Sequence, residues 1–366
     1  SLARPSPVVT TIILMLMIYI GTLYPISLDG LVGPSNVLIT WVVFLLIYSF
    51  VASILPVWAL LQPRDYINCH QLFLGLGLMS LGVIIVSPEV VAPIINPEPK
   101  GAPSWFPFLF ITIACGAISG FHGLVSGGTT SKQVKNFKDA KVIGYGSMIG
   151  EGLLALLASL AVCTGFSDQS HWKSHYSSWG AANGLTAKIN AFVSGAGNFL
   201  SGLGIPENIS ETVIAVLIIS FAATSLDTAC RIQRYIISEI GVSLKIQPLK
   251  SRYTSGFIAI FSAFLLMISG DGGKGGLSLW PLFGATNQML GCLSLVVISV
   301  WLKNNNKKNI YFMVPAVVLF VITSLALIMN IHNFWEVSNY LLLIISVVLL
   351  FIELKILKVG LKVLRS

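Results

Sequence analysis

The chain has 366 residues, of which 55% are hydrophobic and only 10% are charged. This composition excludes a soluble globular enzyme and indicates an integral membrane protein with many spans. The formal net charge of +8 would suit a nucleic-acid-binding protein, but the basic residues lie between long apolar runs, which favours the membrane surface and excludes nucleic acid as a partner.

Ten apolar runs have a length near the twenty residues that cross about 30 Å of hydrocarbon as a helix. The fold class is therefore predicted to be an all-α polytopic membrane protein, and no stretch between the runs is long and mixed enough to build a second core. Residues 1–366 are expected to form one integral membrane domain. The ten runs are 8–26, 36–61, 70–86, 105–131, 142–163, 209–227, 253–269, 279–301, 310–329 and 338–356.

The loops between these runs differ in charge. If the first residues are cytoplasmic, 18 of the 22 Lys and Arg residues fall in the inner segments. Because cytoplasmic loops carry the excess of basic residues, this distribution predicts that both termini are cytoplasmic. It also supports an even number of spans, since an odd number would disturb the partition.

Arg64 and Asp65 are adjacent, opposite charges that directly follow the second run. Such a pair most often forms a local cap or a latch to another loop. The alternative hypothesis is that Arg64 and Asp65 form a gate on the cytoplasmic side.

The run at 105–131 is apolar enough to enter a bilayer but carries five glycines within residues 116–128. Glycine inside a helix costs about 1 kcal/mol relative to alanine, so this is a poor composition for a continuous span. Secondary transporters build midplane sites from interrupted helices of this kind, and the alternative is a tightly packed continuous helix. The segment is predicted to be a broken helix whose substrate-binding residues are Ser119, Gly120, His122, Ser126, Gly127 and Thr129.

His122 and Glu151 lie at similar distances from the loop that joins their two spans, roughly 15 Å deep at 1.5 Å per residue. Ionisable side chains at that depth are functional candidates by default. We expect the pair to line one water-accessible cavity and to carry a coupling proton, the alternative being two static, hydrogen-bonded groups.

The outer connection at residues 164–208 ends in a semi-apolar, glycine-rich piece, 191–206. It is too short to span and is interpreted as a loop that packs onto the helix bundle, with an interfacial or re-entrant segment as the alternative.

The sixth run ends in hydroxyl and carboxyl groups, for which two interpretations stand. Asp227 can pair with Arg231 one turn further on, or it can join neighbouring hydroxyls in an oxygen-rich site for sodium or a proton. The candidate coupling residues here are Thr224, Ser225, Asp227 and Thr228.

Asn287 and Gln288 lie eight or nine residues inside the eighth run. Amides at that depth bind neighbouring helices or a substrate, and we treat both as substrate-site candidates.

The five cysteines show no CxxC spacing and no matching histidine pattern. The sequence therefore predicts no metal site, no disulfide framework and no cofactor.

Five blocks, in this order, resemble the carbon starvation protein A (CstA) family. The resemblance covers the chain from about residue 38 to residue 305. The blocks are LPVWALLQPRDY at 55–66, PFLFITIACGAISGFHGLVSGGTTSKQ at 107–133, IGYGSMIGEGLLAL at 143–156, SLDTACRIQRYI at 225–236 and LWPLFGATNQML at 279–290.

The resemblance implies a bacterial inner-membrane transporter used in nutrient stress, with peptides or pyruvate as substrates and proton coupling in the pyruvate members. It also implies a LeuT-like, APC-type fold, in which the segment at 105–131 is the broken helix of the second inverted repeat. Members of the family begin with a further segment carrying a GHHFAAIAGAGP-like motif, which has no match here. The chain starts at Ser1 without a signal peptide, so we expect it to lack the family's N-terminal helices and to have a separate N-terminal half as a partner.

The leading hypothesis is a secondary transporter that imports a small carboxylate or a short peptide with a cation, a proton being favoured over sodium. The alternatives are a membrane-embedded enzyme or sensor and an inactive fragment of a split transporter. No nucleophile motif, phosphate loop or metal spacing supports the enzyme.

Overall fold

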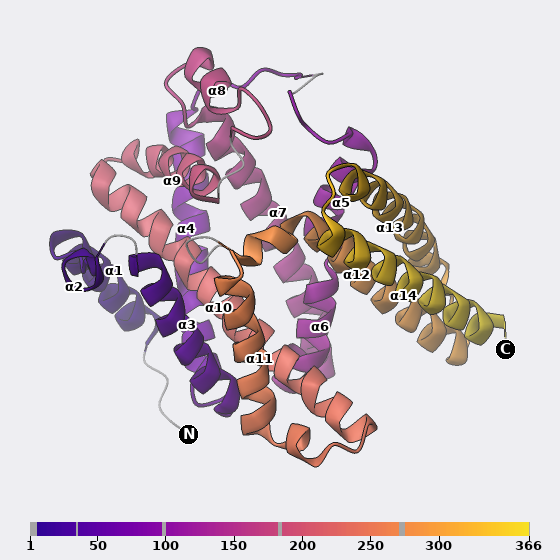
Figure 1. Ribbon diagram of the computed structural model, residues 1–366. Coiled ribbons are helices and arrows are strands. Elements are labelled where there is room, and N and C mark those ends of the chain that lie inside the picture. Colours follow the sequence, from indigo (N-terminus) through magenta and orange to yellow (C-terminus); the bar gives the residue numbers. More distant parts are fainter. Residues whose placement is uncertain (1–5, 34–35, 97–99, 182–184, 271–274, 366) are drawn as a thin grey trace. The chain divides into compact units, whose positions relative to one another are not determined.

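The computed structural model shows an all-helical chain (Figure 1). Among the residues it describes, every regular element is an α-helix or a short 3₁₀ helix. The structure describes residues 6–33, 36–96, 100–181, 185–270 and 275–365. Arg4 and Lys274, which were counted in the charge distribution above, lie outside these ranges.

Eight helical segments of the described chain are long and apolar enough to cross a membrane. Two shorter apolar helices, α1 (Pro7–Leu23) and α11 (Arg252–Ile268), coincide with the other two predicted spans. The remaining spans form α3 (Val37–Ile54), α4 (Leu61–Val86), α5 (Trp105–Ala117) with α6 (Gly120–Gly128), α7 (Phe137–Thr164), α10 (Glu207–Ser243), α12 (Trp280–Asn304), α13 (Ile310–Glu336) and α14 (Tyr340–Arg365).

The outer faces of these helices are apolar. Ile84, Val142 and Phe351 are more than half exposed, and many other large aliphatic and aromatic side chains share this exposure. Lipid hydrocarbon rather than water suits such surfaces. The chain is therefore an all-α, multi-pass membrane protein, as the composition predicts.

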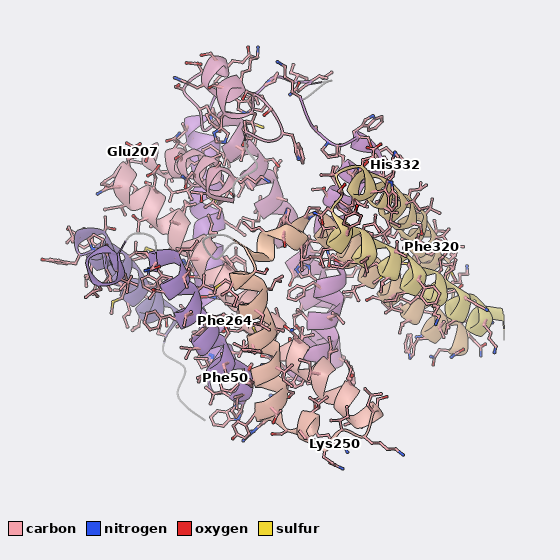
Figure 2. All side chains as sticks on the ribbon, viewed as in Figure 1. Phe50, Glu207, Lys250, Phe264, Phe320 and His332 are labelled. Carbon is pink, nitrogen blue, oxygen red and sulfur yellow. The ribbon has the colours of Figure 1, made fainter. Side chains whose placement is uncertain are left out.

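By its internal contacts the chain divides into two compact units, and the last of the three boundaries along the chain falls inside α11. Unit 1 consists of Ser1–Ala102 and Val134–Ile260, and unit 2 consists of Pro103–Gln133 and Phe261–Ser366. Figure 2 shows the side chains on the ribbon. Within unit 1, the labelled Glu207 is the first residue of α10, and the labelled Lys250 follows the C-terminal end of α10.

The core of unit 1 lies where α1, α4, α7, α9 (Leu185–Ser201) and α10 meet. Phe199, Leu200 and Ile214 are fully buried there, and Met79 packs with them. Three short elements complete the unit: α2 (Asp29–Val32), α8 (Gln169–His175) and η3 (Gln247–Lys250).

The interpretation of residues 191–206 as a loop is wrong, because α9 occupies most of this segment and packs on α4, α7 and α10. Its small residues allow close approach: a Cβ on Gly195 would run into the Ala161 backbone of α7, and one on Gly82 of α4 would run into the backbone of Phe199. The glycines that weaken an isolated helix therefore allow this helix to be buried.

Unit 2 is built on α12, α13 and α14, which pack on one another. The helix α5 packs on α12 and α13, and α6 packs on α12. Leu282, Leu327 and Leu342 fill one core cluster, and Ala316 and Leu319 belong to a second. Two short 3₁₀ helices also belong to this unit: η2 (Thr130–Lys132) follows α6, and η5 (Gly275–Leu279) precedes α12.

Candidate substrate and coupling sites

The glycine-rich segment is interrupted, as predicted. The helix α5 ends at Ala117, Ile118 leaves the helical region with φ −136° and ψ 81°, and α6 begins again at Gly120. Ser119 is extended and acts as the N-cap of α6, its hydroxyl accepting a hydrogen bond from the His122 N–H at 3.4 Å. The break therefore opens the backbone for two residues inside a membrane span, where each peptide group needs a partner.

Asn287 of α12 supplies one of those partners and also binds side chains on both sides of the break. Its side-chain carbonyl accepts a hydrogen bond from the Phe121 N–H at 2.8 Å. Its amide N–H groups donate to the Ser119 hydroxyl at 3.2 Å and to the Cys115 sulfur at 2.9 Å. A single buried amide thus reaches the last turn of α5, the interruption and the first turn of α6.

The first turn of α6 lies directly against α12. A Cβ on Gly120 would clash with the Asn287 carbonyl oxygen, the Leu290 side chain and the Gly291 backbone, and a Cβ on Gly123 would lie 2.7 Å from the Ser294 hydroxyl oxygen. Glycine is required here because two backbones approach within the reach of one methyl group.

The residues predicted to bind substrate fall into two groups. Ser119, Gly120, Asn287 and Gln288 come together at the interruption, and both amide atoms of the fully buried Gln288 lack a hydrogen-bond partner among the described residues. The other four lie at positions along α6 that do not contact Asn287. His122 in the first turn and Ser126 and Gly127 near the C-terminus are exposed, and Thr129, the C-cap, is buried.

The first N–H groups of α6 already have partners in the chain. The Phe121 N–H binds Asn287, the His122 N–H binds the Ser119 hydroxyl, and the Gly123 N–H donates to the Ser119 carbonyl at 3.1 Å. The interruption is therefore held by contacts within unit 2 in this conformation.

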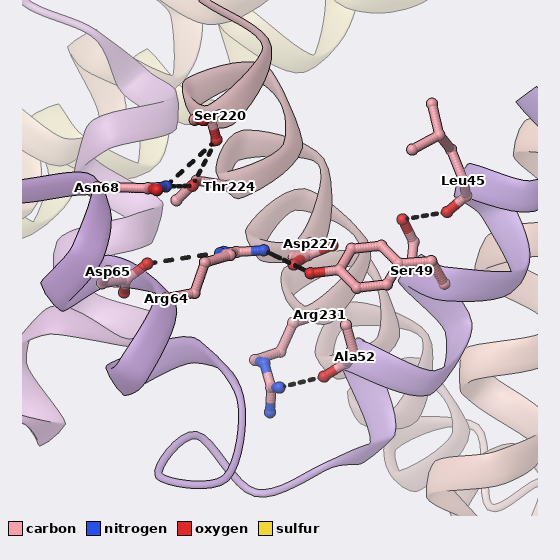
Figure 3. A network of polar contacts seen from close by, with 11 residues as sticks. Leu45, Ser49, Ala52, Arg64, Asp65, Asn68, Ser220, Thr224, Asp227 and Arg231 are labelled. Atoms are coloured by element: carbon pink, nitrogen blue, oxygen red, sulfur yellow. Dashed lines mark hydrogen bonds and ion pairs between the residues drawn. The ribbon is translucent and has the colours of Figure 1, made fainter. Parts of the chain in front are cut away.

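A second polar network lies in unit 1, around Asp227 of α10 (Figure 3). The Asp227 side chain is fully buried, and its Oδ2 atom pairs with the Arg64 guanidinium of α4. The same oxygen accepts a hydrogen bond at 3.0 Å from the Tyr48 hydroxyl of α3, which in turn accepts one from Arg64 at 3.1 Å. The consecutive helices α3 and α4 therefore meet the distant helix α10 at one compensated carboxylate.

Neighbouring groups extend this network along α10. Asn68 donates to the Thr224 hydroxyl at 2.6 Å and to the Ser220 carbonyl at 3.3 Å. One turn beyond Asp227, Arg231 donates to the Ala52 carbonyl of α3. The pairing of Asp227 with Arg231, one of the two alternatives predicted above, is thus not formed, and Asp227 pairs with an arginine from another helix instead.

The candidate coupling residues on α10 do not share one face. Thr224 faces Asn68, Asp227 faces Arg64 and Thr228 is buried, whereas Ser225 is exposed.

The two predicted gate residues have different roles. Arg64 reaches α10 and is mostly buried, while Asp65 is 42% exposed and lies 3.6 Å from the Arg64 guanidinium. The latch to another element, left open by the sequence, is thus made by Arg64.

His122 and Glu151 lie in different units and are both exposed in this structure. The cavity predicted between them remains a prediction.

Sequence reasoning missed Tyr48 and Asn68, which complete the network around Asp227. Only their position in otherwise apolar stretches could have indicated a role, and many membrane helices carry isolated polar residues of this kind. Within the described part of the chain, no three His, Cys, Asp or Glu side chains form a group that could hold a metal ion.

The fold and the site define a multi-pass membrane protein with an interrupted helix held by an amide of a neighbouring helix. The family model described as "Carbon starvation protein CstA" matches residues 3–177 and 167–326. The chain belongs to this family.

Curated relatives agree with the family assignment. The peptide transporter CstA of Helicobacter pylori J99 is 34% identical over 333 residues, which cover 75% of this chain and 48% of that protein. The pyruvate/proton symporter BtsT of Escherichia coli K12 is 31% identical over 400 residues, with 87% and 55% coverage. The peptide transporter CstA of Campylobacter jejuni is 32% identical over 339 residues, with 78% and 48% coverage.

The chain thus spans about half the length of the curated relatives it matches. No solved structure matches it.

Proposed function

We propose that this chain is part of a secondary active transporter that imports a small carboxylate such as pyruvate, or short peptides, together with a proton. The observation that carries the proposal is the interruption at Ile118 and Ser119, held open inside a membrane span by Asn287. An apolar span has no structural need for such a break, whereas transporters use breaks to expose backbone groups to a solute. The names of the relatives, peptide transporter and pyruvate/proton symporter, support the same function.

The proposed substrate site follows the interruption and α6. The N-terminal end of α6 favours negative charge, so a substrate carboxylate would approach it without needing a permanent arginine. Access to the N–H groups of Phe121 and His122 requires the Asn287 and Ser119 contacts to open, so substrate would compete with them. Ser126 and Thr129 would contact the solute further along α6.

The proposed coupling path uses His122, Glu151 and the Asp227 network. The Arg64–Asp227 pair joins α4 to α10 and is suited to act as the cytoplasmic gate, because breaking it separates two helices. A proton on Asp227 would weaken its attraction to Arg64, which would link proton binding to opening. We place both termini in the cytoplasm and the protein in a bacterial inner membrane, with a LeuT-like arrangement of helices, on the strength of the basic loops and the family.

The test is solute uptake by the purified full chain in proteoliposomes. We expect labelled pyruvate or a labelled dipeptide to accumulate when the outside is acidified, and a protonophore to abolish the accumulation. Uptake of neither solute, or uptake that ignores the proton gradient, would contradict the proposal.

Two histidine variants test whether His122 takes part in proton-driven uptake. We expect His122→Ala to reduce proton-driven uptake at least about tenfold, the loss typical of a proton-transfer group. The matched control is His332→Ala, which changes an exposed histidine on α13 that pairs with Glu336. Equal effects of the two variants would remove His122 from the site.

A further inference from the structure

Unit 2 buries a carboxyl group that plays no part in the interrupted helix. Glu353 of α14 is 1% exposed. Its Oε2 atom accepts one hydrogen bond, at 3.3 Å, from the Ser324 hydroxyl of α13. Its Oε1 atom is buried and has no hydrogen-bond partner among the described residues.

The surroundings of Glu353 come from three helices packed on one another. The helix α12 contributes the buried thiol of Cys292, which lies near Glu353 and donates a hydrogen bond to the Ala316 carbonyl at 3.3 Å. The element α13 contributes Ser324. On α14 itself the nearest cation, Lys355, holds its ammonium 4.6 Å from the centre of the Phe351 ring, and the structure gives Glu353 no salt bridge among the described residues.

These groups share one depth. Cys292, Ser324 and Glu353 each lie within one residue of the middle of their helices. A helix of about 26 residues is about 39 Å long and exceeds the roughly 30 Å of hydrocarbon, so a residue at its middle lies inside the hydrocarbon.

The physical cost of charge at that depth decides the state of the carboxyl. Asp227 in unit 1 is equally buried but faces a guanidinium and a phenol. Glu353 has one neutral hydroxyl donor, which offsets little of the cost of an isolated carboxylate away from water. Binding a proton removes that cost, and the protonated Oε1 gains an O–H that can donate when a partner approaches.

We propose that the Glu353 carboxyl is a proton-binding site inside unit 2 and that, resting on the symport proposed above, it binds the coupled proton in addition to the groups proposed there. The carboxylate takes a proton from the outer aqueous side and returns it to the cytoplasmic side. The match to the family model ends at residue 326, before α14 and its carboxyl.

Proton binding can be tested without transport. Dicyclohexylcarbodiimide, an apolar reagent, modifies protonated carboxyl groups in apolar surroundings, and the modified peptide is quantified by mass spectrometry of the full chain. We expect labelling of Glu353 at acidic pH that falls about tenfold per pH unit above its midpoint, and no labelling of this peptide in Glu353→Gln. The exposed Glu336 is the internal control, and it should remain unlabelled. Absence of Glu353 labelling at every pH in the folded wild-type protein would overturn the proposal.

Coupling needs a second measurement in proteoliposomes. Glu353→Gln keeps the size and neutrality of the protonated form, so we expect solute exchange to persist while the response of uptake to a pH gradient is lost. Glu336→Gln should retain both. If Glu353 is labelled but Glu353→Gln keeps its gradient response, the coupling role is wrong. If the wild-type chain transports neither solute, the proposed function fails, while the labelling result still decides whether Glu353 binds a proton.

Discussion

Unit 1 holds the buried Asp227 carboxylate with a guanidinium from another helix, whereas unit 2 holds its interrupted helix with the neutral amide of Asn287. The ion pair and the amide contacts differ in what they require of their partners. An ion pair binds strongly only while both charges are present, because a buried charge without its partner is costly. An amide offers donors and an acceptor together, so it can satisfy an opened backbone without adding charge to the membrane interior.

The comparison suggests how each region would move. Separating Arg64 from Asp227 requires water, a proton or another ion to replace the lost partner. Releasing Asn287 from Phe121 and Ser119 requires only a competing acceptor, such as a carboxylate. The Arg64–Asp227 pair is therefore the stronger of the two contacts, and the Asn287 contacts are the weaker.

The largest effect is expected for Asp227→Ala. The variant leaves Arg64 buried without its carboxylate, and we expect a loss of about 3–5 kcal/mol in stability. Thermal unfolding of the detergent-solubilised protein would measure it. Ser225→Ala, an exposed position on the same helix, should change stability by less than about 0.5 kcal/mol.

The double variant Arg64→Ala with Asp227→Ala sharpens this result. Removing both charges leaves no uncompensated ion, so its loss should be smaller than the sum of the two single losses. Strict additivity would show that the pair does not hold α4 to α10.

A smaller effect is expected for Asn287→Ala. The change leaves the Phe121 N–H and the Ser119 hydroxyl without their main partner, which should cost about 1–3 kcal/mol. It should also raise amide hydrogen exchange at residues 119–123. Thr286→Ala, whose hydroxyl bonds only to carbonyls of its own helix, is the neighbouring control. Unchanged exchange in Asn287→Ala would show that α6 holds the interruption by itself.

The smallest expected effect on stability concerns the N-terminal cap of α8, which is outside the membrane-spanning helices. The Ser170 hydroxyl and the His171 and Ser170 N–H groups bind the Asp168 carboxylate and lower its pKa from 3.8 to about 2. Because the folded pKa is depressed, the stabilisation is present above the unfolded value and is lost as pH falls through about 2. Relative to the intrinsic exchange rate at each pH, the protection of the amides of residues 169–175 should fall in this window in the wild-type protein. In Asp168→Ala this protection should already be low at neutral pH, and unchanged protection there would contradict the capping role.

The transmembrane helices could be predicted from the sequence because their signal is local. A span must satisfy its backbone within one helix and present apolar side chains to lipid, so length and hydropathy reveal it. All ten predicted runs coincide with helices, and the glycines at residues 116–128 indicated the interruption that Ile118 and Ser119 form. The family could be recognised for the same reason, from contiguous blocks of residues.

The ends of helices and the partners of polar groups needed the tertiary structure. The predicted sixth span ends at Asp227, but α10 continues to Ser243, and the predicted last span ends at residue 356, whereas α14 continues to Arg365. With this extension Glu353 lies at the middle of its helix.

The sequence alone determined which segments are apolar helices, where one of them breaks and which family the chain belongs to. The tertiary structure decided that α9 is a buried helix, that Asp227 binds Arg64 and that Asn287 holds the interruption. Helix formation depends on neighbours within a few residues, so it can be read locally. Pairing between helices depends on which faces meet after the chain has folded, and no local pattern of residues contains that information.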